Sequence, residues 1–303
     1  MPKFSLARLT CAVVMTLALA VTASADPIKF ARYPHVSHGK IAFSYHGDIW
    51  IANVDGSNPM RLTAHVGRDI FPRFSPDGQL VAFTSDRFGN PDVFVVPVTG
   101  GEPRQLTFST TSDTVQNWTP DGKGIIFATQ RDSSPWRSPL HIVPLDGGLP
   151  RPMAMDTANT GMLKQDGTMV AFTRKGGAYW RKGNKGNRTD DIWIQDVASK
   201  KITKLTDLDS KAFRDWAHDT SPMWGADGQI YFASERDEIF NIWRIAPTGG
   251  APAQVTRHRN DGIQFPSISP DGKVIAYENE FELWTVDVPG GTPRKVVVDM
   301  AFD

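Results

Sequence analysis

The chain has 303 residues with 33 basic and 33 acidic side chains, so its formal net charge is zero. This balance, together with the lack of a long basic run, argues against a nucleic-acid partner. The 26 glycines and 22 prolines are typical of a turn-rich all-β protein, and no low-complexity segment interrupts the chain.

Residues 1–25 have the pattern of a secretory signal peptide, with a positively charged start, an apolar stretch at residues 11–21 and an Ala-Ser-Ala cleavage pattern before Asp26. We therefore predict an exported protein, periplasmic or extracellular. The apolar stretch is too short for a comfortable membrane span, so no stable span is expected after cleavage. Cleavage would also remove Cys11, the only cysteine, which excludes a cysteine nucleophile, a disulfide and a thiolate metal site.

A turn signature recurs along the rest of the chain at nearly even intervals. The clear copies are Ser75-Pro76-Asp77-Gly78, Thr119-Pro120-Asp121-Gly122 and Ser269-Pro270-Asp271-Gly272, and weaker copies end at Gly39, Gly167 and Gly228. Asp-Gly between two apolar runs predicts a hairpin, because glycine readily takes the positive φ of a tight turn. Successive glycines lie 39, 44, 45, 61 and 44 residues apart, and a period of about 40–45 residues is typical of a β-propeller.

Each turn is flanked by short β-rich runs that together form one unit of four strands. In the second unit these runs are Phe71-Pro72-Arg73-Phe74, Leu80-Val81-Ala82-Phe83, Asp92-Val93-Phe94 and Gln105-Leu106-Thr107. Six units predict one domain over residues 26–303, an all-β, six-bladed propeller with four antiparallel strands per blade. The expected blades cover approximately residues 28–66, 67–110, 111–155, 156–208, 209–260 and 261–300. In-phase aromatic residues of the second and third strands are expected to pack between neighbouring blades, since one blade cannot cover its own faces.

One unit, from Phe71 to Thr107, contains a complete motif: Ser-Pro-Asp-Gly, an apolar run, Ser-Asp-Arg, Asp-hydrophobic-aromatic, and Gly-Gly-x-Pro-x-x-Leu-Thr. This motif resembles the propeller repeats of Tol-system periplasmic proteins and of tricorn proteases. Residues 179–188 with the following Asp191-Ile192-Trp193-Ile194, and the excursion at residues 213–219, look especially like the fourth blade of the N-terminal tricorn propeller. The resemblance covers roughly residues 27–300.

The resemblance implies a serine peptidase family in which this ring gates or exits onto a chamber, while later domains cleave the peptide. We therefore expect a non-catalytic module that gates or docks peptide substrate or product. Its expected partners are peptides or a protein partner, and the remaining peptidase domains if the chain is a fragment. Two alternatives stay open: a free-standing periplasmic Tol-like scaffold that binds a protein, and a propeller hydrolase or lyase with a rim site.

The sequence assigns no catalytic residue, no metal ligand and no cofactor. It contains no Gly-x-Ser-x-Gly nucleophile elbow. His35 and His38 are expected to point to opposite faces of a strand and turn, which does not form a metal pair. Three further histidines fall in loops that share one rim, where a composite site is the alternative to ordinary solvated side chains: His65, His218 and His258.

Four arginines end the second strand of their blades: Arg87, Arg131, Arg174 and Arg236. The structural interpretation is an in-blade ion pair or turn hydrogen bond with a neighbouring acid, Asp86, Asp132 or Glu235. The functional interpretation is a ring of guanidinium groups that attracts peptide carboxylates, because arginine offers a bidentate fork.

Aspartate occupies the same slot before the next blade at Asp69, Asp219 and Asp261, where a turn cap is expected. The basic and aromatic loop at residues 174–188 contains Arg181 and Lys182, and a peptide or partner contact there is the alternative to a solvated loop. With His218 from the next excursion, these residues join the four arginines as candidates for substrate contact. The long fourth unit is therefore where we expect function to reside.

Overall fold

The computed structural model describes residues 26–131, 140–155, 157–174, 189–206 and 217–300. These residues contain no helix and form seven antiparallel sheets, six of four strands and one of two. The predicted signal peptide at residues 1–25 lies outside the described residues. Within the described ranges, no helix is long and apolar enough to cross a membrane.

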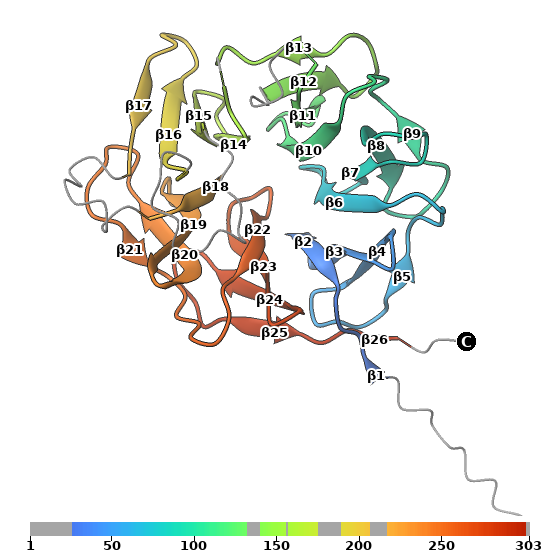
Figure 1. The fold of residues 1–303 in the computed structure, drawn as a ribbon. Helices are drawn as coiled ribbons and strands as arrows, with labels where there is room; N and C mark the ends of the chain where they lie inside the picture. Colours follow the sequence, from blue (N-terminus) through green and yellow to red (C-terminus); the bar gives the residue numbers. More distant parts are fainter. Residues whose placement is uncertain (1–25, 132–139, 156, 175–188, 207–216, 301–303) are drawn as a thin grey trace, which may run out of the picture.

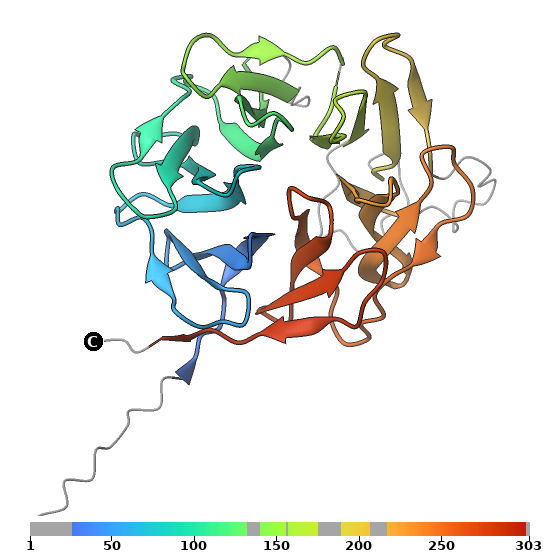
Figure 2. The same ribbon diagram turned by 180° about the vertical axis from the view of Figure 1, so that it is seen from behind.

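The six four-stranded sheets are arranged as blades around a central axis, with the first strand of each blade innermost (Figures 1 and 2). Blades one to three consist of β2 (Arg32–Ser37), β3 (Lys40–Tyr45), β4 (Asp48–Asn53), β5 (Met60–Arg61); β6 (Asp69–Phe74), β7 (Leu80–Ser85), β8 (Asp92–Pro97), β9 (Arg104–Gln105); and β10 (Asp113–Trp118), β11 (Gly124–Thr129), β12 (Leu140–Pro144), β13 (Arg151–Pro152).

Blades four to six consist of β14 (Thr160–Leu163), β15 (Met169–Thr173), β16 (Ile192–Asp196), β17 (Ile202–Lys204); β18 (Asp219–Trp224), β19 (Ile230–Asp237), β20 (Ile239–Ile245), β21 (Ala253–Gln254); and β22 (Gln264–Ile268), β23 (Val274–Asn279), β24 (Glu282–Asp287), β25 (Arg294–Val296). In every blade the four strands follow each other in the chain and pair as neighbours. The predicted six-bladed, all-β propeller with four antiparallel strands per blade is confirmed.

The Ser-Pro-Asp-Gly turn joins the first and second strands of a blade through side-chain hydrogen bonds. In blade two, the Ser75 hydroxyl donates to Asp77 Oδ1 over 2.5 Å, and that oxygen also accepts the backbone N–H of Gln79 at 3.0 Å. Gly78 closes the turn with φ of 71°, a conformation that glycine adopts without a Cβ clash. Thr119 with Asp121 and Ser269 with Asp271 repeat the same hydroxyl-carboxylate contact in blades three and six.

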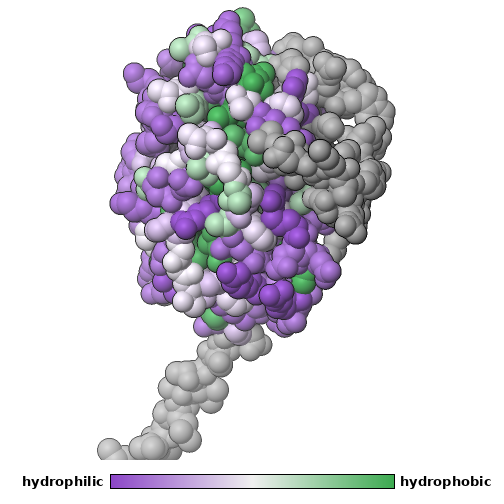
Figure 3. All heavy atoms as spheres, turned by 90° about the vertical axis from the view of Figure 1, so that its left-hand side faces the viewer, coloured by the Kyte–Doolittle hydropathy of each residue, from purple (hydrophilic) through white to green (hydrophobic). Residues whose placement is uncertain are grey.

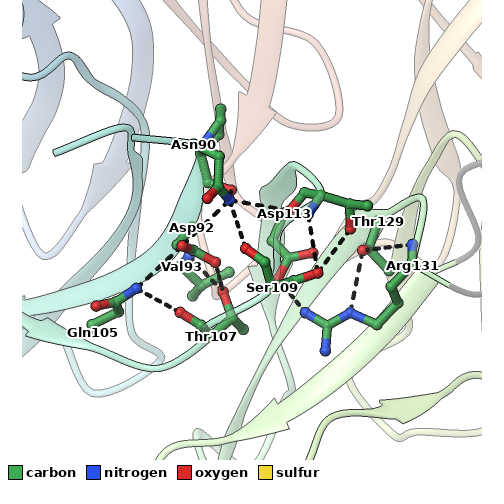
Figure 4. A network of polar contacts seen from close by, with 11 residues as sticks. Asn90, Asp92, Val93, Gln105, Thr107, Ser109, Asp113, Thr129 and Arg131 are labelled. Carbon is green, nitrogen blue, oxygen red and sulfur yellow. Dashed lines mark hydrogen bonds and ion pairs between the residues drawn. The ribbon is translucent and has the colours of Figure 1, made fainter. Parts of the chain in front are cut away.

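The short fourth strand is fastened to the third by the threonine of the Leu-Thr motif. In blade two, Thr107 Oγ1 accepts the N–H of Val93 at 3.0 Å and donates to Asp92 Oδ1 at 2.9 Å (Figure 4). Gln105 Nε2 adds a bond to Asp92 Oδ2 at 3.1 Å. The same threonine-to-backbone bond, 14 residues apart in sequence, recurs at Thr63, Thr206 and Thr256. The repeated Asp and Thr of the sequence motif are therefore parts of one clasp.

The hydrophobic core lies between blades. One large aromatic ring from each second strand is fully buried, at 0% exposure: Phe43, Phe83, Phe127, Phe172, Phe232 and Tyr277. Each packs with residues of an adjoining blade, as where Ile49 and Leu62 of blade one meet Phe83 of blade two. Burying one such side chain contributes about 1.5–3 kcal/mol. The predicted packing of in-phase aromatic residues between neighbouring blades is confirmed for the second strands.

The ring closes without exchanging a strand between blades one and six. Instead β1 (Asp26–Pro27) pairs with β26 (Asp299–Met300) beside them, and the Ile28 N–H donates to the Val298 carbonyl at 2.9 Å. The segment before β26 crosses blade one so closely that a Cβ built on Gly56 would lie 1.7 Å from the Val297 carbonyl oxygen. Both ends of the described chain therefore meet at one point of the circumference (Figure 1).

The outer surface of blades four and five is mostly hydrophilic. Figure 3 views the side that carries β17 and β21, where hydrophobic residues form only a broken strip between hydrophilic areas. No broad apolar face of the kind that marks a large interface is visible on this side.

Candidate functional site

The arginines that follow the second strands hold the beginning of the innermost strand. The side chain of Arg87 is only 6% exposed, and its Nη2 lies 2.8 Å from Oδ2 of the fully buried Asp69. Arg236 Nη2 lies 2.6 Å from Asp219 Oδ2, and Arg131 forms the matching ion pair with Asp113 (Figure 4). In each case the arginine Nε also donates to the hydroxyl of a strand residue two positions earlier: Ser85, Thr129 or Ser234.

These contacts support the in-blade ion pair, but the predicted partners were wrong for two of the arginines. Arg87 and Arg236 pair with Asp69 and Asp219, not with the adjacent Asp86 and Glu235. The reason is the hairpin register. Asp69 lies opposite Ser85, so a residue just beyond Ser85 reaches back to the start of the first strand. Asp132, the acid expected beside Arg131, lies outside the described residues.

The expected turn caps are therefore found at only one of the three repeated aspartates. Asp261 Oδ1 accepts the N–H of Gly262 at 2.8 Å. Asp69 and Asp219 instead bind guanidinium groups, and Asp69 Oδ1 makes no hydrogen bond within the described chain. These two carboxylates are anchors of the innermost strands.

The remaining candidates occupy different settings. The guanidinium carbon of Arg174 lies 5.0 Å from the ring centre of Trp193, a cation–π contact. His218 is buried, and its Nδ1 accepts the N–H of Asp190 at 3.1 Å, so it is not a solvated loop side chain. Arg181 and Lys182 lie outside the described residues. No group of three or more His, Cys, Asp or Glu side chains in the described ranges is arranged to hold a metal ion.

Four innermost strands contain a bulge in which a non-glycine residue before proline has a positive φ. These residues are Tyr33, Phe71, Ser221 and Phe265, with φ of 56°, 55°, 54° and 47°. The strand register shifts at each of these bulges. Such a conformation costs about 1–3 kcal/mol per residue and re-aims the side chain. Because it recurs in four blades, the bulge is a regular feature of the innermost strands.

Three of the bulges bring aromatic rings of blades six, one and two together. The ring centre of Tyr33 lies 4.2 Å from that of Phe71 and 4.6 Å from that of Phe265. The Arg32 guanidinium lies within 5.3 Å of both Tyr33 and Phe265. All three rings are only partly buried. They form a cluster near the central axis, at the second or third residue of each innermost strand.

A small cavity of about 60 Å³ lies deeper along the axis, among the innermost strands. Its wall contains one residue from the innermost strand of every blade: His35, Arg73, Asn117, Met162, Met223 and Ser267. In blades two to six this residue stands two positions before the turn signature, and in blade one, where the strand is one residue closer to the turn, it stands one position before. We call this set the channel ring. The ring was not singled out from the sequence, although the offset from the turn, which is the same in blades two to six, was the signal that could have found five of its members.

Three loops on the same end of blades one to three are tied into one surface, which we call the loop ledge. It comprises residues 62–68, 86–91 and 106–112. The Arg68 N–H donates to Asp86 Oδ1 at 2.5 Å, and Asn90 Nδ2 donates to the Ser109 carbonyl at 2.9 Å. One large apolar side chain on each loop is exposed, at 102%, 69% and 77%: Val66, Phe88 and Phe108.

A closed ring of six four-stranded blades around a central axis defines the class of this protein, a β-propeller (Figure 1). Residues 28–292 match the family model described as the tricorn protease N-terminal beta propeller domain. The chain belongs to this family.

Similar proteins agree with this assignment. Tricorn protease homolog 1 of Streptomyces coelicolor is 31% identical over 284 residues, which cover 92% of this chain and 25% of that protein. A crystal structure of the tricorn protease superposes with a TM-score of 0.77 at 21% identity, covering 91% of this chain and 27% of the other. A TolB homolog of Chlorobium luteolum is 44% identical over 59 residues, 18% of this chain and 14% of that protein. The chain thus spans about a quarter of the tricorn relatives it matches.

Proposed function

We propose that this propeller is a non-catalytic module of an exported, tricorn-like serine peptidase, and that it docks or gates the peptides that reach or leave the chamber. Family membership supports this proposal, because the matched model is the propeller domain of a protease. The peptide-cleaving residues would then belong to other peptidase domains, which are the proposed partners of the ring. We therefore expect the purified chain to hydrolyse no peptide by itself.

The observation that carries the docking function is the loop ledge. Its three apolar side chains are exposed on loops that hydrogen bonds join to one another, so the loops present these side chains in one arrangement. Isolated exposed apolar residues are common, whereas several on one tied surface are typical of a binding site. The ring of Phe88 also contacts that of Phe94 in a tilted arrangement, with ring centres 6.0 Å apart.

The arginines contribute to the same face in an indirect way. The proposed contact face includes the loops that carry Arg87, Arg131, Arg174 and Arg236. Arg87, Arg131 and Arg236 form ion pairs with buried aspartates, which hold the loops in place. The same ion pairs neutralise the guanidinium groups, so these arginines would attract a peptide carboxylate only weakly. The basic loop with Arg181 and Lys182, and the segment with His218, belong to the proposed face as candidate contacts of blade four.

Fluorescence anisotropy tests this proposal with fluorescein-labelled peptides of a casein digest and the purified chain without residues 1–25. We expect saturable binding that weakens at least about tenfold in the double variant Phe88→Ser/Phe108→Ser, the equivalent of about 1.4 kcal/mol. Leu149→Ser is the matched control, since Leu149 is 87% exposed on a loop between the third and fourth strands, at the opposite end of its blade. An equal loss in the control, or no peptide binding by the parent chain, would overturn the proposal.

A second candidate is a Tol-like periplasmic scaffold that binds a folded protein. The 44% identity to a TolB homolog over 59 residues favours it. In that case the loop ledge would bind a folded partner and discriminate against short peptides. Cross-linking of the chain in a periplasmic extract, compared with Phe88→Ser/Phe108→Ser and Leu149→Ser, distinguishes the two. A ledge-dependent protein adduct without peptide binding would support the scaffold.

A further inference from the structure

The channel ring has one charged and two polar donor side chains on adjacent blades. Arg73 donates from Nε to the Gln116 carbonyl at 3.0 Å and from Nη1 to the Pro72 carbonyl at 2.8 Å. Within the described ranges no carboxylate pairs with it. Its position deep in the protein lowers the pKa to about 10, so the guanidinium stays protonated at neutral pH.

The neighbouring His35 provides a second, buried donor. Only 1% of the residue is exposed, and its Nδ1 accepts the Phe74 N–H at 3.0 Å. The proton of the neutral imidazole therefore sits on Nε2, which is buried and has no hydrogen-bond partner of normal geometry. Burial and the charge of Arg73 lower the pKa of His35 well below its usual range, against a smaller opposing effect of the Ile268 backbone.

Asn117 provides a third donor. Its Oδ1 accepts the Trp118 N–H at 2.8 Å, and because the residue lines the cavity, its Nδ2 group is the donor that it can offer a ligand. The wall on blades four and five is different, because Met162 and Met223 occupy the equivalent positions. These blades lie across the ring from blades one and two (Figure 1). The cavity is therefore cationic and donor-rich on the side of blades one to three, whereas on the side of blades four and five the two methionines stand beside Thr160 and Ser221.

We infer that the channel ring is a binding site for a small carboxylate, held by Arg73, His35 and Asn117, with its short carbon stem against Met162 and Met223. No carboxylate of the described chain balances the charge of Arg73, and a bound carboxylate would offer acceptor oxygens and a charge opposite to that of the guanidinium. Since a water needs about 10–15 Å³ of such volume, 60 Å³ holds about four to six water-sized groups. An acetate or propionate ion, or the terminal carboxylate of a peptide, has this chemistry.

Ligand-observed NMR titration with acetate and propionate tests the site in the purified chain. We expect saturable binding to the parent protein, at least about tenfold weaker in Arg73→Gln and about threefold weaker in Arg73→Lys, which keeps the charge but loses the fork. Arg104→Gln is the matched control, because this exposed arginine lies on the outer strand β9. Methylammonium, a cation of similar size, should not bind.

Two peptides that differ only in a free or an amidated C-terminus identify the source of the carboxylate by competition with acetate. Competition by the free acid alone assigns the site to a peptide end, and competition by neither assigns it to a free small carboxylate. The inference does not rest on the proposed docking function, since acetate binding is expected whether or not the loop ledge binds peptides. Lack of saturable acetate binding, or equal affinity in Arg73→Gln and Arg104→Gln, would overturn it. Arg73→Lys serves as the test if Arg73→Gln fails to fold.

Discussion

The seam between blades six and one differs from the other seams of the ring. Between blades two and three, the hydroxyl of Thr84 accepts the Val115 N–H of the next innermost strand at 2.9 Å. Glu278 occupies the same position of its strand in blade six. Its Oε1 accepts the Tyr33 N–H at 2.6 Å, and its Oε2 binds Arg32 Nε at 2.6 Å.

At the same strand position, the acceptor of a backbone N–H from the next blade is a neutral side chain in one seam and an ionisable side chain in the other, so only the second seam can respond to pH. Thr84 satisfies a backbone N–H without a net charge. Glu278 does so with a carboxyl that is 3% exposed, and burial raises its pKa to about 7 in spite of Arg32. The closing seam also receives the segment that crosses Gly56.

The largest effect is expected where that segment crosses blade one. Gly56→Ala places a Cβ 1.7 Å from the Val297 carbonyl oxygen at a φ of 89°, so the free energy of unfolding should fall by about 4 kcal/mol or more. Gly47→Ala is the control, because its φ is 88° but nothing lies within 4 Å, and it should lose only about 1 kcal/mol. Urea unfolding measures both, and similar losses would contradict a tight crossing.

A smaller loss is expected from an ion pair within one blade. Arg87→Met leaves the fully buried Asp69 carboxylate without its partner, which should cost about 3–4 kcal/mol in urea unfolding. Arg294→Met removes a pair whose side chains are 60% and 45% exposed, and it should change stability by less than 1 kcal/mol. If both variants lose equally little, the Asp69 pair does not anchor its strand.

The closing seam should respond to pH. Because the folded pKa of Glu278 is about 7 and its ordinary value is 4.5, the folded state binds the proton more tightly. This contribution to stability is complete below pH 4.5 and is lost as the pH rises through 7, a total of about 2–3 kcal/mol. Glu278→Gln should therefore show a flatter stability profile in urea unfolding from pH 4.5 to pH 8.5. Parallel profiles would show that Glu278 is not the group responsible.

The smallest effect is expected at an ordinary seam. Thr84→Val keeps the shape of the side chain but leaves the buried Val115 N–H without an acceptor, so stability should fall by about 1–2 kcal/mol. The loss should be the same at pH 5 and pH 8, unlike that at Glu278. A pH-dependent loss in Thr84→Val would remove the proposed distinction between the seams.

The fold was accessible from the sequence because its determinants are local and repeated. Asp77 and Gly78 fix a turn within five residues, and Thr107 bonds to the backbone of Val93, only 14 residues away in the neighbouring strand. The candidate site was less accessible, since it depends on register and on contacts across the ring. The partner of Arg87 required the pairing of Asp69 with Ser85, and the nearer Asp86 misled the prediction.

The channel ring shows a different limit of the sequence. In the sequence, Arg73 follows a proline in a predicted strand, and nothing there distinguishes it from an arginine on the surface. Its importance arises only because six strands bring His35, Asn117 and three further residues around it. The offset from the turn identifies the positions that meet in blades two to six, but only the closed ring adds His35 and shows that no acid in the described chain accompanies the arginine.

The pairing of β1 with β26 determines how the ring responds to mechanical load. Asp26 lies opposite Met300 and Pro27 opposite Asp299, so both chain ends leave the pair on the same side. In an antiparallel pair the hydrogen bonds are perpendicular to the strands, and a pull on both ends breaks them one after another. Peeling of this kind needs little force. The β1–β26 pair would therefore separate first. Only then would the tension load the Arg32–Glu278 ion pair and blades one and six, which it joins.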